Sequence, residues 1–71
     1  MFMMKGLGET IKALRIEKGL TQPELAEIIG VLKGMISIWE NNVNEPKATH
    51  IKNLALALEV SSDYLLGLKD E

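Results

Sequence analysis

Residues 20–41 constrain the fold more than any other part of this 71-residue chain, because they contain the start and stop signals of two short helices. Thr21 and Glu24 have the Thr-x-x-Glu spacing of a capping box, in which each side chain satisfies a free backbone N–H group at a helix start. Gly30 ends that helix and makes a tight turn. Ala26, four residues earlier, has a small side chain that lets the next helix cross closely. The pattern predicts two packed helices, the second of which is held away from the body of the domain.

The size and composition of the chain limit the fold further. A chain of 71 residues forms one domain with a small and marginally stable core. It has no cysteine, so neither a disulfide nor a thiolate metal site reinforces that core, and well-packed helices or a partner must stabilise it. At 46% hydrophobic, the composition is too apolar for a disordered chain.

No targeting or membrane segment is recognisable in the chain. No apolar run approaches the roughly 20 residues of a membrane span, and residues 1–4 lack the length and the basic start of a signal peptide. We therefore expect a cytoplasmic domain with no membrane partner. Three readings of residues 1–4 stay open: extra residues at the start site, an arm packed on the domain, or part of a dimer contact.

Apolar residues recur at helical spacing along the chain, and turn-forming residues interrupt the pattern. This arrangement predicts an all-α domain between an N-terminal arm at residues 1–6 and a C-terminal tail at residues 68–71. The expected helices are 7–18, 22–29, 33–41, 47–58 and a short last helix that Ser61 or Ser62 caps and that ends at Leu66. Gly19 and Gly67 follow the first and the last helix as stop signals.

The expected helix 33–41 has an apolar and a polar face when its residues are placed at about 100° intervals. The apolar face, which should pack inward, comprises Leu32, Met35, Ile36 and Trp39. The polar face comprises Lys33, Gly34, Ser37 and Asn41, with Ile38 at its edge. A short helix of this kind suits insertion into the DNA major groove. In the helix 47–58, the stripe expected to be buried comprises Ala48, Ile51, Leu54, Ala55 and Leu58.

The segment 20–41 resembles the helix-turn-helix of the Cro/C1-type (XRE-like, lambdoid phage repressor) family, and the resemblance covers residues 7–67. The matching motifs are Ile11-Lys-Ala-Leu-Arg15, Gly19-Leu-Thr-Gln22, Trp39-Glu-Asn41, Pro46, Leu54-Ala55 and Asp63-Tyr-Leu-Leu-Gly67. The resemblance implies a compact five-helix repressor-like domain that binds double-stranded operator DNA. It also implies a homodimer with its interface near Ser62–Leu68, and an ion pair between Arg15 and Glu40 that joins the first and third helices.

Seven residues are candidates for DNA contact: Gln22, Lys33, Gly34, Ser37, Ile38, Asn41 and Asn42. Gln22 lies at a helix N-terminus, where free N–H groups and the helix dipole favour a phosphate. In the resembling family a glutamine at this position bonds the DNA backbone, although simple surface polarity would also explain it. Lys33 could reach guanine O6 or N7 or a phosphate, or it could be an ordinary solvated lysine.

The expected helix 33–41 is the candidate reading helix, the one that would contact base edges. Two of its positions depart from the family, which often has polar or basic side chains there. Gly34 would let the DNA approach the backbone, and Ile38 would pack on a thymine methyl group or on a protein partner. Ser37 contacts DNA or bonds a backbone carbonyl. Leu32 departs as well, because a serine or threonine cap is common there and its loss typically costs about 1 kcal/mol.

The remaining polar and aromatic residues have both functional and structural readings. The amides of Asn41 and Asn42 can bond phosphate oxygens, which fix register, although loop chemistry alone also favours asparagine. Trp39 and Tyr64 lie on apolar stripes and should anchor the core. His50 has no second histidine or cysteine nearby and is expected on the helix surface, not in a metal site.

The charge balance and the residue inventory rank the possible functions. Ten acidic and eight basic residues give a net charge of −2, which predicts only modest non-specific affinity for DNA. The favoured function is a sequence-specific transcription regulator, most simply a repressor, acting as a dimer. A protein-interaction module of antitoxin or antirepressor type on the same fold is the alternative. An enzyme is the least favoured reading, because the chain offers no catalytic set, and we expect no cofactor, metal or small-molecule substrate.

Overall fold

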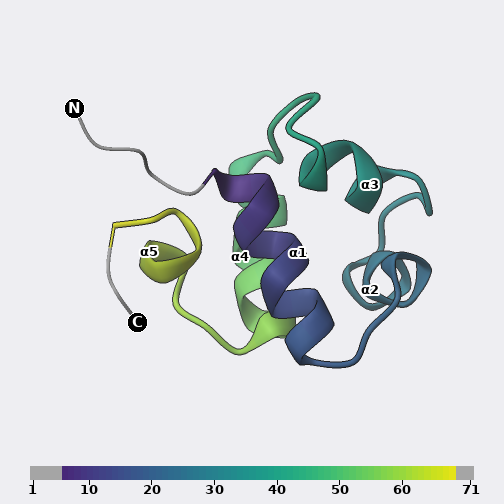
Figure 1. Ribbon diagram of the computed structural model, residues 1–71, viewed down its shortest axis with the longest axis horizontal. Coiled ribbons are helices and arrows are strands. Elements are labelled where there is room, and N and C mark those ends of the chain that lie inside the picture. The colour runs from purple at the N-terminus through teal and green to yellow at the C-terminus, as the bar shows by residue number, and fades with distance from the viewer. Residues whose placement is uncertain (1–5, 69–71) are drawn as a thin grey trace.

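The computed structural model describes residues 6–68, and all regular structure within that range is helical (Figure 1). The helices are α1 (Leu7–Glu17), α2 (Gln22–Ile29), α3 (Met35–Glu40), α4 (Ala48–Leu58) and α5 (Ser62–Leu65). This confirms the predicted all-α fold with five helices. The predicted arm at residues 1–6 and tail at residues 68–71 lie almost entirely outside the described residues.

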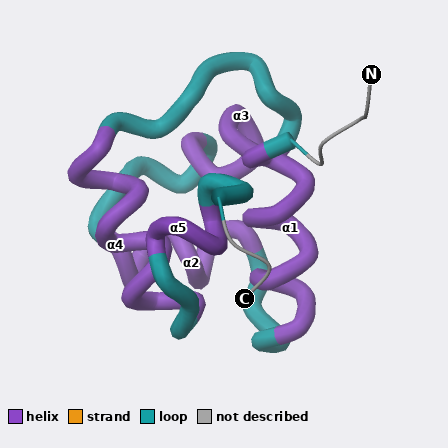
Figure 2. Tube along the Cα trace, turned by 90° about the vertical axis from the view of Figure 1, so that its left-hand side faces the viewer, coloured by secondary structure: helices purple, strands orange, loops and turns teal. Residues whose placement is uncertain are grey.

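The helices are arranged around the crossing of α1 and α4. In Figure 1, α2 and α3 lie on one side of this pair and α5 lies on the other. The main helix contacts are those of α3 with α1 and α2, of α2 with α4, and of α5 with α1 and α4. Figure 2 shows that loops join these helices and that the longest connection leads from α3 to α4. The candidate reading helix α3 therefore rests on the other helices while one of its faces stays uncovered.

One apolar core holds the helices together. Its buried members are Ile11, Leu14, Leu25, Ala26, Ile36, Trp39, Leu54, Ala55, Leu58 and Leu65. Trp39 is 2% exposed, which confirms the core role predicted for it. Tyr64 is half-buried and packs against the same cluster. Because all five helices contribute a residue, the position of α3 depends on the whole domain.

The local signals around the turn of 20–41 act as predicted. The Thr21 hydroxyl accepts a hydrogen bond from the Glu24 backbone N–H at 3.2 Å, and the Glu24 carboxylate accepts one from the Thr21 N–H at 2.8 Å. These two bonds complete the capping box at the start of α2. Gly30 ends α2 with a φ of 77°, a left-handed conformation that suits glycine. Ala26 is buried, as we expect of a small side chain at a close helix crossing.

The start of α3 differs from the prediction. The helix begins at Met35 and not at residue 33, because Lys33 and Gly34 form a turn in which the Leu32 carbonyl accepts a hydrogen bond from the Met35 N–H at 2.9 Å. Leu32 is 79% exposed, so the prediction that it packs inward is wrong. Helical periodicity does not apply to Leu32, since the helix has not yet begun at that residue. Gly34 at the N-cap forms no side-chain cap bond, and leucine cannot replace the missing cap.

Two predictions for α4 are also corrected. Ala48 is exposed, because it is the first residue of α4 and precedes the turn that reaches the core. His50 is half-buried and not simply a surface residue, with its ring centroid 5.1 Å from that of Trp39. It lies four residues before the buried Leu54 and therefore shares that face of α4. Its Nδ1 atom is buried and has no hydrogen-bond partner within residues 6–68.

The last helix ends one residue earlier than predicted, and the structure shows which serine caps it. The Ser61 hydroxyl accepts a hydrogen bond from the Tyr64 N–H at 3.0 Å, so Ser61 and not Ser62 caps α5. Leu66 follows as the C-cap, and Gly67 has a φ of 82°, which confirms the glycine as the stop signal.

Candidate nucleic-acid interface

A buried ion pair fixes α3 against α1. The Arg15 Nε donates to Glu40 Oε2 at 2.6 Å, and Arg15 Nη2 donates to Oε1 at 3.1 Å. Arg15 Nη1 also donates to the Leu20 carbonyl at 2.7 Å. Glu40 is 6% exposed, and its hydrogen bond raises the pKa of Arg15 although burial opposes the charge. The pair implied by the family resemblance is therefore present and joins the first and third helices.

Gln22 extends this network to the second helix. Its Nε2 donates to Glu40 Oε1 at 2.9 Å, so the Glu40 carboxylate accepts bonds from both Arg15 and Gln22. As the first residue of α2, Gln22 thus ties the start of that helix to the end of α3. This bond uses one of the two amide N–H groups. The predicted phosphate contact of Gln22 stays a prediction, and the carboxylate bond would orient the amide that makes it.

The uncovered surface of the turn and α3 contains most of the candidate residues. Lys33 and Gly34 are exposed, and Ser37 is half-buried. Asn41 donates from Nδ2 to the Ser37 carbonyl at 2.8 Å and to its hydroxyl at 3.2 Å, so these two candidates lie together. Ile38 is half-buried and packs against the core, which gives its apolar side chain a structural reason.

Asn42 has a structural role that the sequence reasoning missed. Its Oδ1 accepts a hydrogen bond from the Gly8 N–H at 3.1 Å, and its Nδ2 donates to Glu9 Oε1 at 3.0 Å. Because Gly6 at the N-cap of α1 has no side chain to offer, Asn42 caps that helix from a position 34 residues away. A phosphate contact of its amide, still a prediction, would compete with both bonds.

Gly8 is a second position that sequence reasoning missed. A Cβ atom there would collide with the Trp39 carbonyl oxygen and would lie 2.5 Å from the Glu40 carbonyl oxygen. Glycine therefore permits the close approach of α1 to the end of α3. No local signal marks this requirement, since Gly8 lies inside an otherwise ordinary helical pattern.

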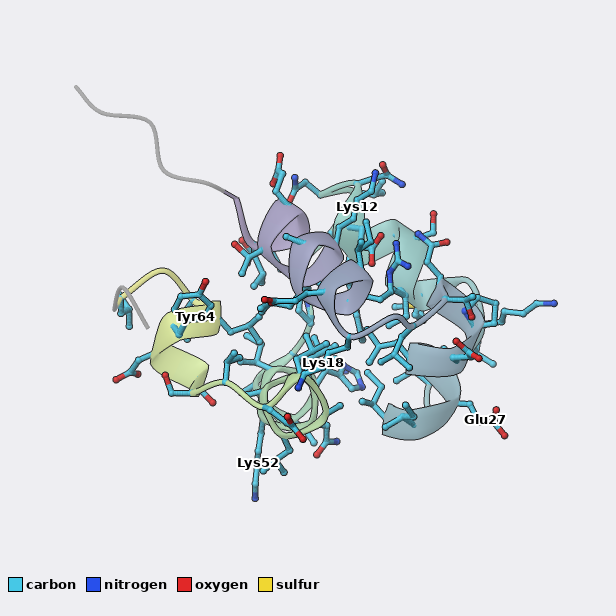
Figure 3. All side chains as sticks on the ribbon, turned by 60° about the horizontal axis from the view of Figure 1, so that its bottom comes forward. Lys12, Lys18, Glu27, Lys52 and Tyr64 are labelled. Atoms are coloured by element: carbon cyan, nitrogen blue, oxygen red, sulfur yellow. The ribbon has the colours of Figure 1, made fainter. Side chains whose placement is uncertain are left out.

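The charge around α3 is sparse. Lys33 is the single Lys or Arg in residues 20–44, whereas Glu24 and Glu27 on α2 are exposed acidic residues. Figure 3 shows the Glu27 side chain pointing outward from α2. Within this stretch of sequence, Lys33 is therefore the one side chain whose charge attracts a polyanion.

In residues 6–68, no three His, Cys, Asp or Glu side chains are grouped so that they could hold a metal ion. None of the helices in that range has the length and apolar character needed to cross a membrane.

The chain belongs to the Cro/C1-type helix-turn-helix family. A family model described as helix-turn-helix matches residues 11–65. The repressor protein C2 of Salmonella phage P22 is 38% identical over 60 residues, which cover 84% of this chain and 28% of the repressor. The transcriptional regulator SinR of Bacillus licheniformis is 39% identical over 66 residues, which cover 92% of this chain and 60% of SinR. The chain thus spans less than two thirds of the length of either relative.

Solved structures show the same fold at similar identity. The P22 c2 repressor in complex with a synthetic operator superposes with a TM-score of 0.87 at 35% identity, covering 93% of this chain and 100% of that one. SinR in complex with DNA superposes with a TM-score of 0.78 at 37% identity, covering 83% of this chain and 95% of that one. The resemblance first inferred from the motifs is confirmed, and so is the helix-turn-helix fold.

Proposed function

We propose that this domain is a sequence-specific DNA-binding transcription regulator that acts as a repressor on operator DNA. The observation that carries the proposal is the attachment of α3. The Arg15–Glu40–Gln22 network fixes that helix on the domain while the face bearing Lys33, Gly34 and Ser37 stays uncovered. A rigidly held and exposed short helix is the element that this motif places in the major groove.

The candidate residues take different parts in the proposed complex. Gln22 and Asn41 position the domain by contacting phosphates, Lys33 and Ser37 reach base edges or a neighbouring phosphate, and Gly34 admits the edge of the duplex. Ile38 contributes an apolar contact. Asn42 supports the interface by holding α1 against the end of α3, since its side-chain atoms already bond Gly8 and Glu9.

A homodimer completes the proposal. Two copies related by a two-fold axis would bind half-sites about one DNA turn apart. The proposed dimer surface is Ser62–Leu68, where Leu66 and Leu68 are exposed large apolar side chains. Contact with a second copy would remove apolar surface of both leucines from water.

The test is selection of binding sites from random duplex DNA, followed by fluorescence-anisotropy titration of the selected duplex between 50 and 200 mM salt. We expect a two-fold symmetric motif and steep salt dependence. Lys33→Ala should weaken binding and, if the lysine meets a phosphate, reduce the salt slope by about one. Lys52→Ala is the matched control, because Figure 3 shows Lys52 pointing away from α4 on the side opposite α3. Failure to select any motif at low salt would overturn the proposal.

A protein-interaction module is the second candidate, and the same face favours it. Leu32, in the turn before α3, is largely exposed, Ile38 on α3 is half-buried, and the acidic total of the chain opposes DNA. The two functions differ in their response to Lys33→Ala. The substitution should weaken an operator complex but leave a complex dominated by apolar contacts intact, which co-purification with the partner would measure.

A further inference from the structure

An open apolar groove lies between α2 and α4, and no residue of α3 lines it. The groove has a volume of about 400 Å³ and is lined by Ile28 and Ile29 from α2 and by Asn53, Leu56 and Ala57 from α4. Ile28 is 57% exposed and Leu56 is 69% exposed, although both are large apolar side chains. The groove therefore leaves apolar surface in water that a partner would cover with a gain in free energy.

The two helices that border the groove carry opposite charges. Helix α2 contains Glu24 and Glu27 and no Lys or Arg, whereas α4 contains Lys52 and no Asp or Glu. Glu24 is engaged in the capping box. Figure 3 shows Glu27 projecting from α2 and Lys52 projecting from α4. Both side chains are exposed, and neither forms an ion pair within residues 6–68. The groove thus has an acidic border along α2 and a basic border along α4.

This arrangement is complementary to itself. A two-fold rotation that places α4 of a second copy against α2 of the first brings Lys52 of each copy to Glu27 of the other. The same rotation brings Leu56 of each copy toward Ile28 of the other, which covers apolar surface in the middle of the contact. The half-buried Asn53 amide offers both donors and an acceptor, so it can pair with the same amide of the second copy.

We propose that the groove between α2 and α4 is a self-association surface, on which a second copy of this chain docks face to face about a two-fold axis. The surface shares no residue with Ser62–Leu68, the proposed dimer contact, so dimers formed there can associate further through their grooves. The contact is small compared with the roughly 20–30 residues per side of a stable interface. The association is therefore weak and stays open in the dilute samples of a DNA titration, where Lys52→Ala remains a valid control.

Charge reversal tests the surface, with amide shifts of the ¹⁵N-labelled domain followed on dilution from millimolar to micromolar concentration. For wild type we expect concentration-dependent shifts at residues 28–29 and 53–57. Glu27→Lys and Lys52→Glu each place like charges opposite one another at two points of the contact. Each variant alone should therefore associate at least about tenfold more weakly than wild type. An equimolar mixture of the two variants should regain the association, because opposite charges meet again at both points.

Lys12→Glu is the matched control for Lys52→Glu. It makes the same change in net charge, and Figure 3 shows Lys12 on the side of the molecule opposite Lys52. This variant should associate as wild type does. Glu27→Lys brings the net charge of −2 to zero, so a general effect of charge would strengthen its association and not weaken it. Circular dichroism of each variant checks that these exposed positions tolerate the reversal.

The outcomes are distinct from those that test DNA binding. The proposal is overturned if the wild-type shifts at 28–29 and 53–57 do not depend on concentration, or if only residues 62–68 respond. It is also overturned if either reversal associates as wild type does, or if the mixture fails to regain the association. None of these results bears on the proposed function, which selection of binding sites tests separately.

Discussion

The ion pair between Arg15 and Glu40 should orient α3 more than it stabilises the domain, and paired substitutions can separate these effects. Glu40→Leu leaves the Arg15 guanidinium, whose side chain is 11% exposed, without its carboxylate partner. Removing one member of a buried pair costs about 3–5 kcal/mol. A core of this size rarely supplies more than about 3–5 kcal/mol in total. We therefore expect Glu40→Leu to be largely unfolded at 25 °C.

The double variant Arg15→Met with Glu40→Leu should behave differently. Apolar side chains of similar volume replace both charges, an exchange that is often neutral or stabilising. Two hydrogen bonds are still lost, at the Leu20 carbonyl and at the Gln22 amide, for about 1 kcal/mol each. The free energy of unfolding of the double variant should thus lie within about 2 kcal/mol of wild type. Its affinity for the selected duplex should nevertheless fall, because Gln22 is no longer oriented by the carboxylate.

Urea denaturation followed by the fluorescence of Trp39 measures these stabilities, since this is the single tryptophan of the chain and it is buried beside Glu40. Anisotropy on the folded double variant measures DNA binding. The reasoning is refuted if the double variant is as unstable as Glu40→Leu alone. It is also refuted if the folded double variant binds the duplex with wild-type affinity.

Three further predictions follow from contacts outside this pair. Gly8→Ala should lower the free energy of unfolding by about 1–3 kcal/mol, because its Cβ collides with backbone carbonyls. A Cβ atom at Gly34 would meet open space, so Gly34→Ala should change the free energy of unfolding by less than about 0.5 kcal/mol. Urea denaturation of the two alanine variants measures this difference. Asn42→Ala should lower the free energy of unfolding by about 1–2 kcal/mol, because the cap of α1 is lost. Asn42→Gly should lower it by less, because glycine tolerates the φ of 59° at this position. The hydrogen bond from Lys18 lowers the pKa of Glu59, so this pair stabilises the domain above the ordinary glutamate range and the effect is lost as the pH falls through the lowered pKa. Carboxyl NMR titration should show the lowered midpoint in wild type and its return to the ordinary range in Lys18→Met.

The parts of the fold that local signals determine were predictable from the sequence. The bounds of α2 agree with the prediction, because Thr21 and Glu24 mark its start and Gly30 marks its end within a few residues of chain. The Arg15–Glu40 pair was predictable only through the family resemblance, since no local pattern links positions 25 residues apart. Helical periodicity, which is a local signal, identified most of the buried core residues.

The errors concern residues whose environment depends on distant contacts or on where a helix begins. Helical periodicity places Leu32 on the apolar face of a helix that in fact begins at Met35. Asn42 bonds the start of α1, and Gly8 meets the end of α3, so each requires knowledge of a contact between segments far apart in sequence. The DNA contacts themselves stay predictions, because a helix face identifies accessible residues but not the groups they meet.

An NMR titration of the ¹⁵N-labelled domain with the selected duplex tests the central claim most directly. The account predicts that the largest amide shift changes fall on Leu32–Ile38 and at Gln22, with smaller changes along α4. Large changes confined to other helices, with the amides of Leu32–Ile38 unmoved at saturating duplex, would contradict it.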